Sequence, residues 1–171
     1  MIDTPVAGPL PGHRLDHPDE LASEWDAWRE RVRATYEAVE YTCAHRLADA
    51  TLAGPVAVQV VAGLIARPQV FRYFGLPYSG RIAKLAEARL AEAAAGELAT
   101  VCGWAQLSEQ LDAVPQAHRE ALVVTCVRGD DDAALAAVWG CDEAAAAAGH
   151  AAMLAFLREL VRPGLAPSEE E

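Results

Sequence analysis

Histidine, carboxylate and thiol side chains could support catalysis or bind a metal, but their spacing in this chain predicts neither. A zinc site needs convergent ligands, and the four cysteines are widely separated, with no C-x-x-C pair. We therefore expect no metal, and small buried thiols in a reducing cytosol. The cysteines are Cys43, Cys102, Cys126 and Cys141.

Histidine–carboxylate pairs are the other candidates for acid–base chemistry. His45 and Asp49 are four residues apart, which on a helix is more typical of a surface pair than of a catalytic one. His118 and Glu120 lie where a helix is predicted to begin and need no catalytic role. No serine has a G-x-S-x-G setting, and no glycine-rich phosphate loop occurs. The sequence therefore predicts no catalytic residue, no cofactor and no enzyme activity.

Aromatic and basic side chains are concentrated between residues 67 and 89. Four aromatics lie in the segment 69–79, and a helix predicted from about residue 78 to 95 carries further cations. Stacking on aromatic rings together with positive charge is how proteins hold single-stranded nucleic acid. The alternative is that the aromatics pack beneath the loop and that the cations form a solvated face. If a DNA contact exists, we expect it at Arg67, Arg72, Tyr73, Arg81, Lys84 and Arg89.

The segment 111–160 reads as three helices. Pro115 at a first-turn position opens the first helix, and Gly129 ends it. The acidic turn Asp130–Asp132 supplies an N-cap and a negative first turn for a short second helix over 133–139.

A glycine then separates the second and third helices. Gly140 breaks the chain after residue 139, and Asp142 caps a third helix over 143–160. The small residues Ala136 and Ala146 on either side of Gly140 match the spacing of a helix-turn-helix unit, in which the helices cross closely.

This C-terminal segment resembles region 4 of the extracytoplasmic-function sigma factors of RNA polymerase. About fifty residues match the family pattern in order, and the resemblance implies a helix-turn-helix that reads the −35 promoter element. The family carries lysine and arginine along the recognition helix, where this chain has Ala147, Gly149 and Ala152. The matching residues are Leu111, Pro115, Arg119-Glu120, Gly129, Leu135-Ala136, Trp139-Gly140 and Leu157-Arg158-Glu159.

The first half resembles region 2 of the same family. Residues 56–59 match a "DLVQ" core, and an aromatic, proline-containing loop leads into residues 78–84, which match "WLYRIARNR". The resemblance implies polymerase contacts at Val56 and Gln59, and capture of the −10 element by the aromatic and basic segment. The family's acidic residue falls on Val56, whose side chain offers no carboxylate for the family's polar contact with the polymerase.

Composition and periodicity predict an all-α protein with two small helical domains joined by a short linker. Alanine dominates, and residues 19–43 place apolar side chains every three or four positions. A second helix, over 56–67, is apolar nearly all round and should be central to a bundle. The expected parts are a flexible arm (1–18), a region 2-like domain (19–95), a linker (96–106), a region 4-like domain (107–161) and an acidic tail (162–171).

Charge is unevenly distributed between the two halves. Residues 1–95 hold ten basic and twelve acidic side chains, whereas residues 96–171 hold four and thirteen. Duplex DNA is bound by neutralising phosphates and read by polar groups in the major groove, and the helix over 143–160 offers few of either. We therefore expect weakened −35 reading.

The linker is short for a protein that must bridge two promoter elements. Elements on the order of 20 base pairs apart are separated by roughly 60–70 Å at ~3.4 Å per base pair. About ten linker residues reach at most ~36 Å when fully extended. We therefore expect the halves to pack together through Leu98, Val101 and Trp104.

These observations predict a sigma-factor-like protein of transcription regulation. Its expected partners are core RNA polymerase, promoter DNA bound weakly, and a further protein such as an anti-sigma factor. The alternative is a degenerate homologue that no longer binds DNA and acts through protein–protein contacts as a regulator, decoy or oligomer. No apolar run of about 18 residues and no signal peptide occur, so we expect a cytoplasmic protein without a membrane partner.

Overall fold

The computed structural model describes residues 18–71, 80–98 and 102–162, which form helices and no strand. The predicted all-α class is confirmed. The predicted arm and tail lie outside the described residues, apart from Pro18 and Arg162. The elements are α1 (Pro18–Ala44), η2 (Ala50–Leu52), α2 (Ala53–Ile65), α3 (Pro68–Phe71), α4 (Gly80–Ala94), α5 (Trp104–Asp112), α6 (Gln116–Leu122), η3 (Val123–Val127), α7 (Asp132–Trp139) and α8 (Glu143–Leu160).

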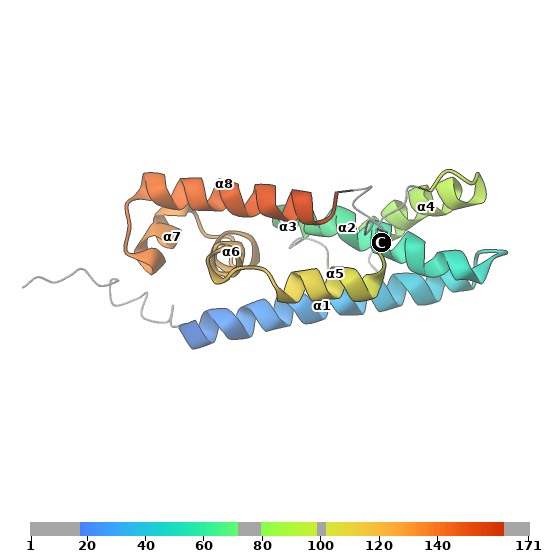
Figure 1. Ribbon diagram of the computed structural model, residues 1–171, viewed down its shortest axis with the longest axis horizontal. Coiled ribbons are helices and arrows are strands. Elements are labelled where there is room, and N and C mark those ends of the chain that lie inside the picture. The colour runs from blue at the N-terminus through green and yellow to red at the C-terminus, as the bar shows by residue number, and fades with distance from the viewer. Residues whose placement is uncertain (1–17, 72–79, 99–101, 163–171) are drawn as a thin grey trace, which may run out of the picture.

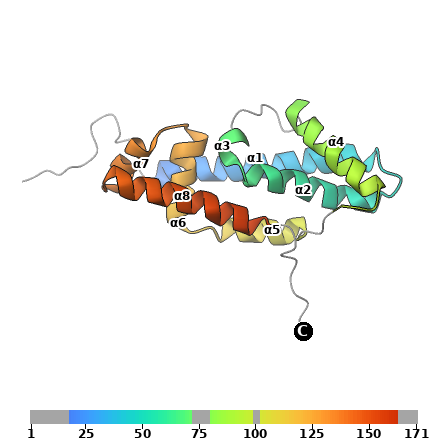
Figure 2. The same ribbon diagram turned by 90° about the horizontal axis from the view of Figure 1, so that it is seen from above.

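Helix α1 is the longest element and packs against both halves of the molecule. Its apolar residues recur every three or four positions, and Trp25, Val32 and Val39 are buried, as the sequence predicted. α2 and α4 pack against α1 toward one end, while α6 and η3 pack against it toward the other (Figure 1). Seen from above, α7 and α8 lie toward one end of α1 and α4 toward the opposite end (Figure 2).

Helix α2 is buried on nearly every side, as expected of a central helix. Within it only Gly54, Pro55 and Gly63 are not buried. The helix begins at Ala53, three residues before the predicted start. It follows η2, whose first turn is capped by Asp49. Such an all-round apolar surface needs neighbours on all faces, and α1 and α4 supply two of them.

Helix α5 begins inside the segment predicted to be the linker. It starts at Trp104, so the connection from α4 to α5 is shorter than predicted. Its Leu107 and Leu111 are fully buried, and the ring of Trp104 stacks on Tyr36 of α1 with centroids 4.4 Å apart and planes 8° apart. Leu98 also packs against the core, as predicted, whereas Val101 lies outside the described residues.

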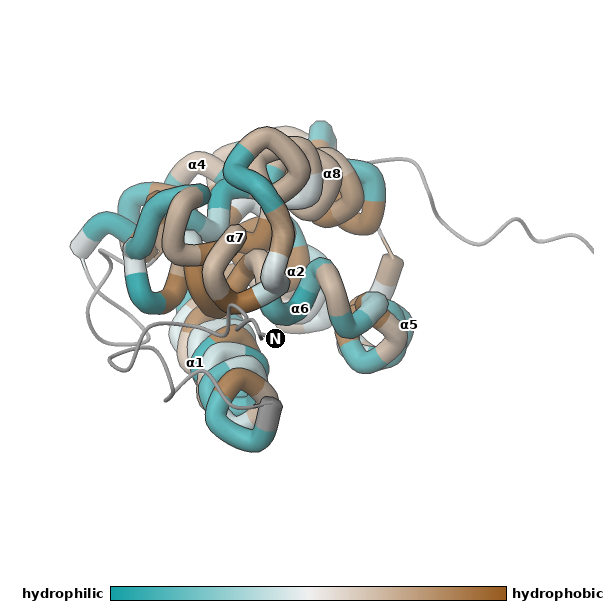
Figure 3. The backbone as a smooth tube through the Cα atoms, turned by 90° about the vertical axis from the view of Figure 1, so that its left-hand side faces the viewer, coloured by the Kyte–Doolittle hydropathy of each residue, from teal (hydrophilic) through white to brown (hydrophobic). Residues whose placement is uncertain are grey.

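One continuous hydrophobic core joins the two halves. Trp28 and Val56 from the first half belong to the same buried cluster as Leu122, Leu135 and Met153 from the second. Viewed along the long axis, apolar backbone positions face inward between the helices and polar ones face outward (Figure 3). The predicted separation into two domains is therefore not confirmed, because the buried side chains do not divide into two clusters.

Candidate functional site

Helices α7 and α8 are joined by a tight turn whose capping residues are those predicted from the sequence. Asp131 caps α7 by accepting a hydrogen bond from the Ala134 backbone N–H at 3.0 Å. Asp142 caps α8 by accepting one from Ala145 at 2.8 Å. Gly140 ends α7 with φ of 69°, in the left-handed region that glycine adopts without strain. The predicted helix–turn–helix boundaries are confirmed.

Small and apolar side chains form the inner faces of this unit. Ala136 of α7 and Ala146 of α8 are both buried, as the spacing predicted. Met153 and Leu157 continue the inner face of α8 and are fully buried. α8 therefore has a fixed orientation, and the identity of its outward residues decides what the unit can bind.

Trp139 fixes the orientation of α7 against α6 and α8. Its indole Nε1 donates a hydrogen bond to the Glu120 carboxylate at 2.8 Å. A Cβ placed on Gly149 would lie 2.5 Å from a ring carbon of Trp139, closer than two carbon atoms can approach. Gly149 therefore allows the ring to pack against α8. In the resemblance to sigma region 4, Gly149 stood out only because it replaces a lysine or arginine of the family.

The outward face of α8 consists almost entirely of methyl groups. The face begins with the acidic Asp142 and Glu143, and the next charged side chains are Arg158 and Glu159 in the last turn. Such a face offers bases no donor or acceptor for a bidentate contact, and phosphates no cation along most of its length. The exposed alanines are Ala144, Ala145, Ala148, Ala151, Ala152 and Ala155.

The two histidines near α8 are used within the protein. His150 Nδ1 lies 2.8 Å from Asp132 Oδ1, which ties α8 to the first turn of α7. The His118 ring packs on Phe156 with centroids 4.8 Å apart. Both side chains therefore stabilise the packing of α6, α7 and α8 around the turn.

The predicted nucleic-acid contacts on α4 lie on two different faces. Arg81 and Lys84 are exposed, one turn apart, on the side of α4 opposite the buried Ile82 and Ala86. Arg89 is only partly exposed and forms an ion pair with Glu92 at 2.9 Å. Arg81 and Lys84 share an exposed face of α4, and Arg89 lies nearer the buried face.

The remaining predicted contacts are less informative. Arg67, directly after α2, is exposed. Arg72 and Tyr73 lie outside the described residues. Phe71 is 1% exposed, and the Arg31 guanidinium lies 4.5 Å from the centre of its ring. This aromatic therefore packs inside the protein, as the alternative interpretation of the cluster expected.

Val56 and Gln59, the positions matched to the polymerase-binding core of the family, are both buried. Val56 is 0% exposed and Gln59 is 9% exposed, because α2 is enclosed by its neighbours. In this conformation neither side chain presents a surface to a partner. Both side chains pack inside the protein here, and the polymerase contact implied by the resemblance stays a prediction.

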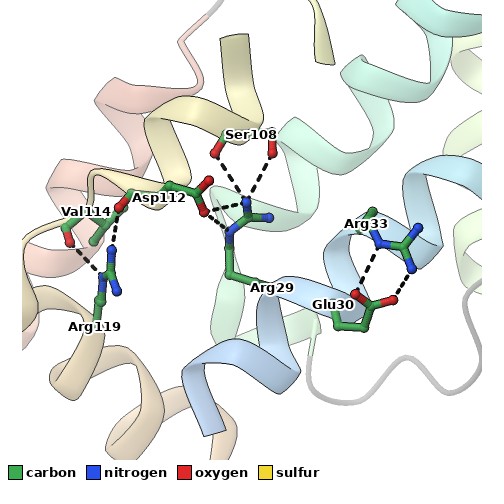
Figure 4. Close-up of polar contacts among 7 residues, drawn as sticks. All are labelled: Arg29, Glu30, Arg33, Ser108, Asp112, Val114 and Arg119. Atoms are coloured by element: carbon green, nitrogen blue, oxygen red, sulfur yellow. Dashed lines mark hydrogen bonds and ion pairs between the residues drawn. The ribbon is translucent and has the colours of Figure 1, made fainter. Parts of the chain in front are cut away.

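A polar cluster links α1 to the C-terminal half through Asp112, the last residue of α5 (Figure 4). Arg29 of α1 donates to the Asp112 carboxylate at 2.7 Å and to the Ser108 hydroxyl at 3.1 Å. Arg119 of α6 donates to the Val114 carbonyl at 2.8 Å and also to the Asp112 carbonyl. Three helices are thus held together by two guanidinium groups around the end of α5.

A second ion pair joins the same two regions. Arg128, directly after η3, donates to both carboxylate oxygens of Glu24 on α1, at 3.0 and 2.7 Å. The side chains are 21% and 34% exposed, so the pair is partly shielded from water. The sequence reasoning missed both cross-links, since the partners are far apart in the chain. The only local signal was arginine on α1 beside its apolar stripe.

The structure does not join the histidine–carboxylate pairs considered as possible catalytic groups. His45 Nδ1 lies 2.7 Å from the Tyr41 carbonyl, while Asp49 accepts from Thr51. Glu120 binds Trp139, and His118 contacts Phe156. Among the described residues no group of three histidine, cysteine or acidic side chains is placed to hold a metal.

Two of the cysteines have altered acidity. Burial raises the pKa of the Cys43 and Cys102 thiols, which favours the protonated form. Cys43 and Cys126 are buried, as expected of structural thiols, whereas Cys141 in the turn before α8 is exposed. The expectation of buried thiols therefore holds for Cys43 and Cys126, holds in part for the half-buried Cys102, and is wrong for Cys141, because the turn leaves it on the surface.

Comparison with known proteins identifies no relative. No family model, no curated protein and no solved structure matches this chain. Within residues 18–71, 80–98 and 102–162, no helix is both long and apolar enough to cross a bilayer.

Proposed function

We propose that this chain is a sigma-factor-like protein of transcription regulation that binds core RNA polymerase, promoter DNA or both, with weakened reading of the −35 element. The observation that carries the proposal is the capped unit of α7, Gly140 and α8. Its turn and its crossing residues fall at the positions where the chain resembles sigma region 4. Such a unit presents its second helix as a rigid rod suited to the major groove.

Weakened duplex reading follows from the side chains on α8. Each good bidentate base contact contributes ~1–3 kcal/mol of discrimination, and each phosphate contact needs a donor or a cation. The exposed face of α8 carries alanine where such groups would be required. The proposal therefore gives the C-terminal unit the geometry of a DNA reader and little affinity for duplex DNA.

Any remaining DNA contact is proposed for the exposed cations of the first half. Arg67, Arg81 and Lys84 are exposed, and Lys84 lies on the solvent face of α4. They would act on the phosphates of a melted strand, for which charge rather than base reading supplies most of the affinity. The family arrangement of two separable domains, residues 19–95 and 107–161, belongs to this proposal, and it requires the shared core to open.

Titration of a single-stranded −10 oligonucleotide at two salt concentrations tests the DNA part of the proposal. Affinity should fall with salt, and Lys84→Gln should reduce the slope of log K against log salt by about 0.7, the value for one phosphate contact on a single strand. Arg33→Gln is the matched control, since Arg33 is paired with Glu30 and Glu37 on α1. Absent or salt-independent binding would discard this part.

Gel filtration of the full chain with and without core RNA polymerase tests the other part. Co-elution with the polymerase would support a sigma-like role, and separate elution would contradict the proposed polymerase binding. Because Val56 and Gln59 are buried, we expect Gln59→Ala to weaken co-elution only if it also lowers the melting temperature of the free chain.

A degenerate homologue that acts through protein–protein contacts is the second candidate. It is favoured by the methyl face of α8 and by the two polar cross-links that hold the halves together. This candidate predicts that neither polymerase nor DNA changes the elution volume. The same pair of experiments therefore separates the two functions.

A further inference from the structure

A cavity of about 260 Å³ lies where α1 meets the helical turn that follows α6. Ala27 and Trp28, adjacent on α1, supply apolar surface on one side. Pro68 of α3, together with Cys126 and Val127 of η3, supplies the rest of the described apolar lining. Both halves of the protein thus contribute walls, and the cavity exists only while they are packed together.

The local backbone explains why the helices do not close over this space. Residues Val123–Val127 form a π-helix, in which the Arg128 N–H bonds the Val123 carbonyl at 2.8 Å. The wider turn removes the regular side-chain ridges with which a helix fills the groove of its neighbour. Such turns are rare and are frequent at functional sites.

An aromatic ring and a thiol lie in the walls of the cavity. Trp28 is 6% exposed, and its ring is held beside that of Trp25 with centroids 5.0 Å apart and planes 32° apart. Cys126 is 2% exposed, and its Sγ lies 3.4 Å from the Thr125 hydroxyl. Indole rings and sulfur atoms both make favourable contacts with a further aromatic ring.

The charged side chains of the described lining are engaged within the protein. Glu24 accepts hydrogen bonds from Arg128 at 3.0 and 2.7 Å. Arg31 donates to the Phe71 carbonyl at 3.0 Å, and its guanidinium lies 4.5 Å from the centre of the Phe71 ring. A ligand held by the apolar walls leaves all of these contacts in place, so its binding needs no charge of either sign.

We propose that this cavity binds a small aromatic molecule whose ring lies against Trp28 and between Ala27, Pro68 and Val127. Burial of apolar surface and the contact between rings supply the affinity. An apolar cavity of about 150 Å³ holds one six-carbon ring. The larger volume here therefore suits a ligand of about ten non-hydrogen atoms. The proposal does not depend on the function proposed above.

Occupancy should also stabilise the junction between the two halves. A ligand that binds only the folded state raises the melting temperature, and here it contacts α1, α3 and η3 at once. If the halves must separate during function, such a ligand would oppose that step.

Calorimetric titration of the full chain with 4-ethylphenol tests the proposal, with 4-ethylcyclohexanol as the matched probe. The two have the same number of non-hydrogen atoms and no charge at neutral pH, but only the first has a flat aromatic ring. We expect a Kd of about 0.1–1 mM for 4-ethylphenol, as is usual for a ligand of this size. The saturated probe should bind about three- to tenfold more weakly, because it loses the contact with the indole. Equal affinities, or no binding of 4-ethylphenol at about 10 mM, would overturn the proposal.

Two substitutions locate the binding. Trp28→Leu should abolish the preference for the aromatic probe. Because Trp28→Leu could also unfold the protein, Ala27→Leu provides a second test by adding bulk to the wall. It should weaken 4-ethylphenol at least about tenfold, which corresponds to about 1.4 kcal/mol. Ala88→Leu, at an exposed position of α4 outside the described lining, is its control and should leave the affinity unchanged. Full affinity in folded Ala27→Leu would overturn the assignment to this cavity.

Discussion

The α7–α8 unit and helix α4 differ in two properties: the geometry of the helices and the charge of the exposed side chains. The C-terminal unit has capped helices, a glycine turn and a tryptophan packed against a glycine, yet its outward face carries methyl groups. α4 has ordinary helical packing through Ile82 and Ala86, and it presents Arg81 and Lys84 to solvent. The capped helix–turn–helix geometry and the exposed cations therefore occur in different parts of the chain.

Under the proposed function, this difference means that the geometry of a recognition element is kept while its contacts are lost. The geometry depends on inward residues, which the core holds in place, whereas the contacts depend on outward residues that stability does not constrain. The proposed function would depend on the outward set. The two regions are connected through α1, which packs against α4 directly and against α6 and η3, the elements on which α8 and α7 pack.

The largest expected effect comes from breaking the contact through which α1 supports the C-terminal half. Trp25 is 2% exposed, and the Arg119 guanidinium lies 5.1 Å from its ring centre. Trp25→Ala should destabilise the whole chain by about 3–5 kcal/mol, in one cooperative transition by chemical denaturation. Tyr41→Ala on the same helix, where the residue is 70% exposed, should change stability by less than about 0.5 kcal/mol. Two transitions in Trp25→Ala, with one unchanged, would show that the halves are separate domains.

The next largest effect is expected at Gly149, and it tests whether this glycine is needed for the Trp139 ring to pack against α8. Gly149→Ala should cost about 1–3 kcal/mol, because the new methyl group overlaps the Trp139 ring. In a Trp139→Leu background the same change should be neutral or stabilising, since alanine favours helix over glycine. Gly63→Ala is the control: apart from its chain neighbours and its own helix backbone, no atom lies within 4 Å of the added Cβ, so it should stabilise by about 0.5–1 kcal/mol. An equal effect of Gly149→Ala in both backgrounds would contradict the packing described.

A smaller effect is expected at the cap of α8. Asp142→Ala removes the acceptor for the Ala145 N–H and should destabilise the protein by about 1 kcal/mol. Asp142→Asn keeps an acceptor for the capping hydrogen bond, so it should destabilise the protein by less than Asp142→Ala does. Thermal melts followed by circular dichroism measure both. A loss as large in the asparagine variant would mean that charge, and not the hydrogen bond, stabilises the helix start.

The smallest effect concerns the ion pair between the two regions. Glu24→Gln should cost about 0.5–1 kcal/mol, since the pair is partly exposed and solvent screens it. The loss should shrink at high salt, because screening weakens the pair in the parent protein. Glu30→Gln, in an exposed pair within α1, should have a smaller effect. If the loss of unfolding free energy in Glu24→Gln does not depend on salt, the loss comes from packing and not from the ion pair.

Local sequence signals were sufficient to predict helices α1, α4, α7 and α8. Asp131, Gly140 and Asp142 act within three or four residues, so their roles could be inferred without knowledge of tertiary structure. The apolar stripe of α1 was equally clear from its period. α5 was missed because its short apolar period, with Leu107 and Leu111, follows the glycine-containing stretch that was interpreted as a linker.

Long-range contacts could not be predicted from these signals. Arg29 and Asp112 are separated by 83 residues, and Arg128 and Glu24 by 104. Nothing in either neighbourhood specifies the partner. The burial of Val56 and Gln59 likewise depends on their tertiary surroundings. Helix α2 is apolar nearly all round, so its residues are enclosed by neighbours and do not form a surface.

The most direct test of the central claim, a promoter-reading scaffold whose α8 lacks reading groups, compares single-stranded and duplex forms of one promoter-derived sequence. Fluorescence anisotropy with the full chain at two salt concentrations gives both affinities. We predict salt-dependent binding of the single strand, at least about tenfold weaker binding of the duplex, and no effect of Ala148→Asp on sequence preference. Tight, sequence-selective duplex binding that Ala148→Asp abolishes would contradict the account.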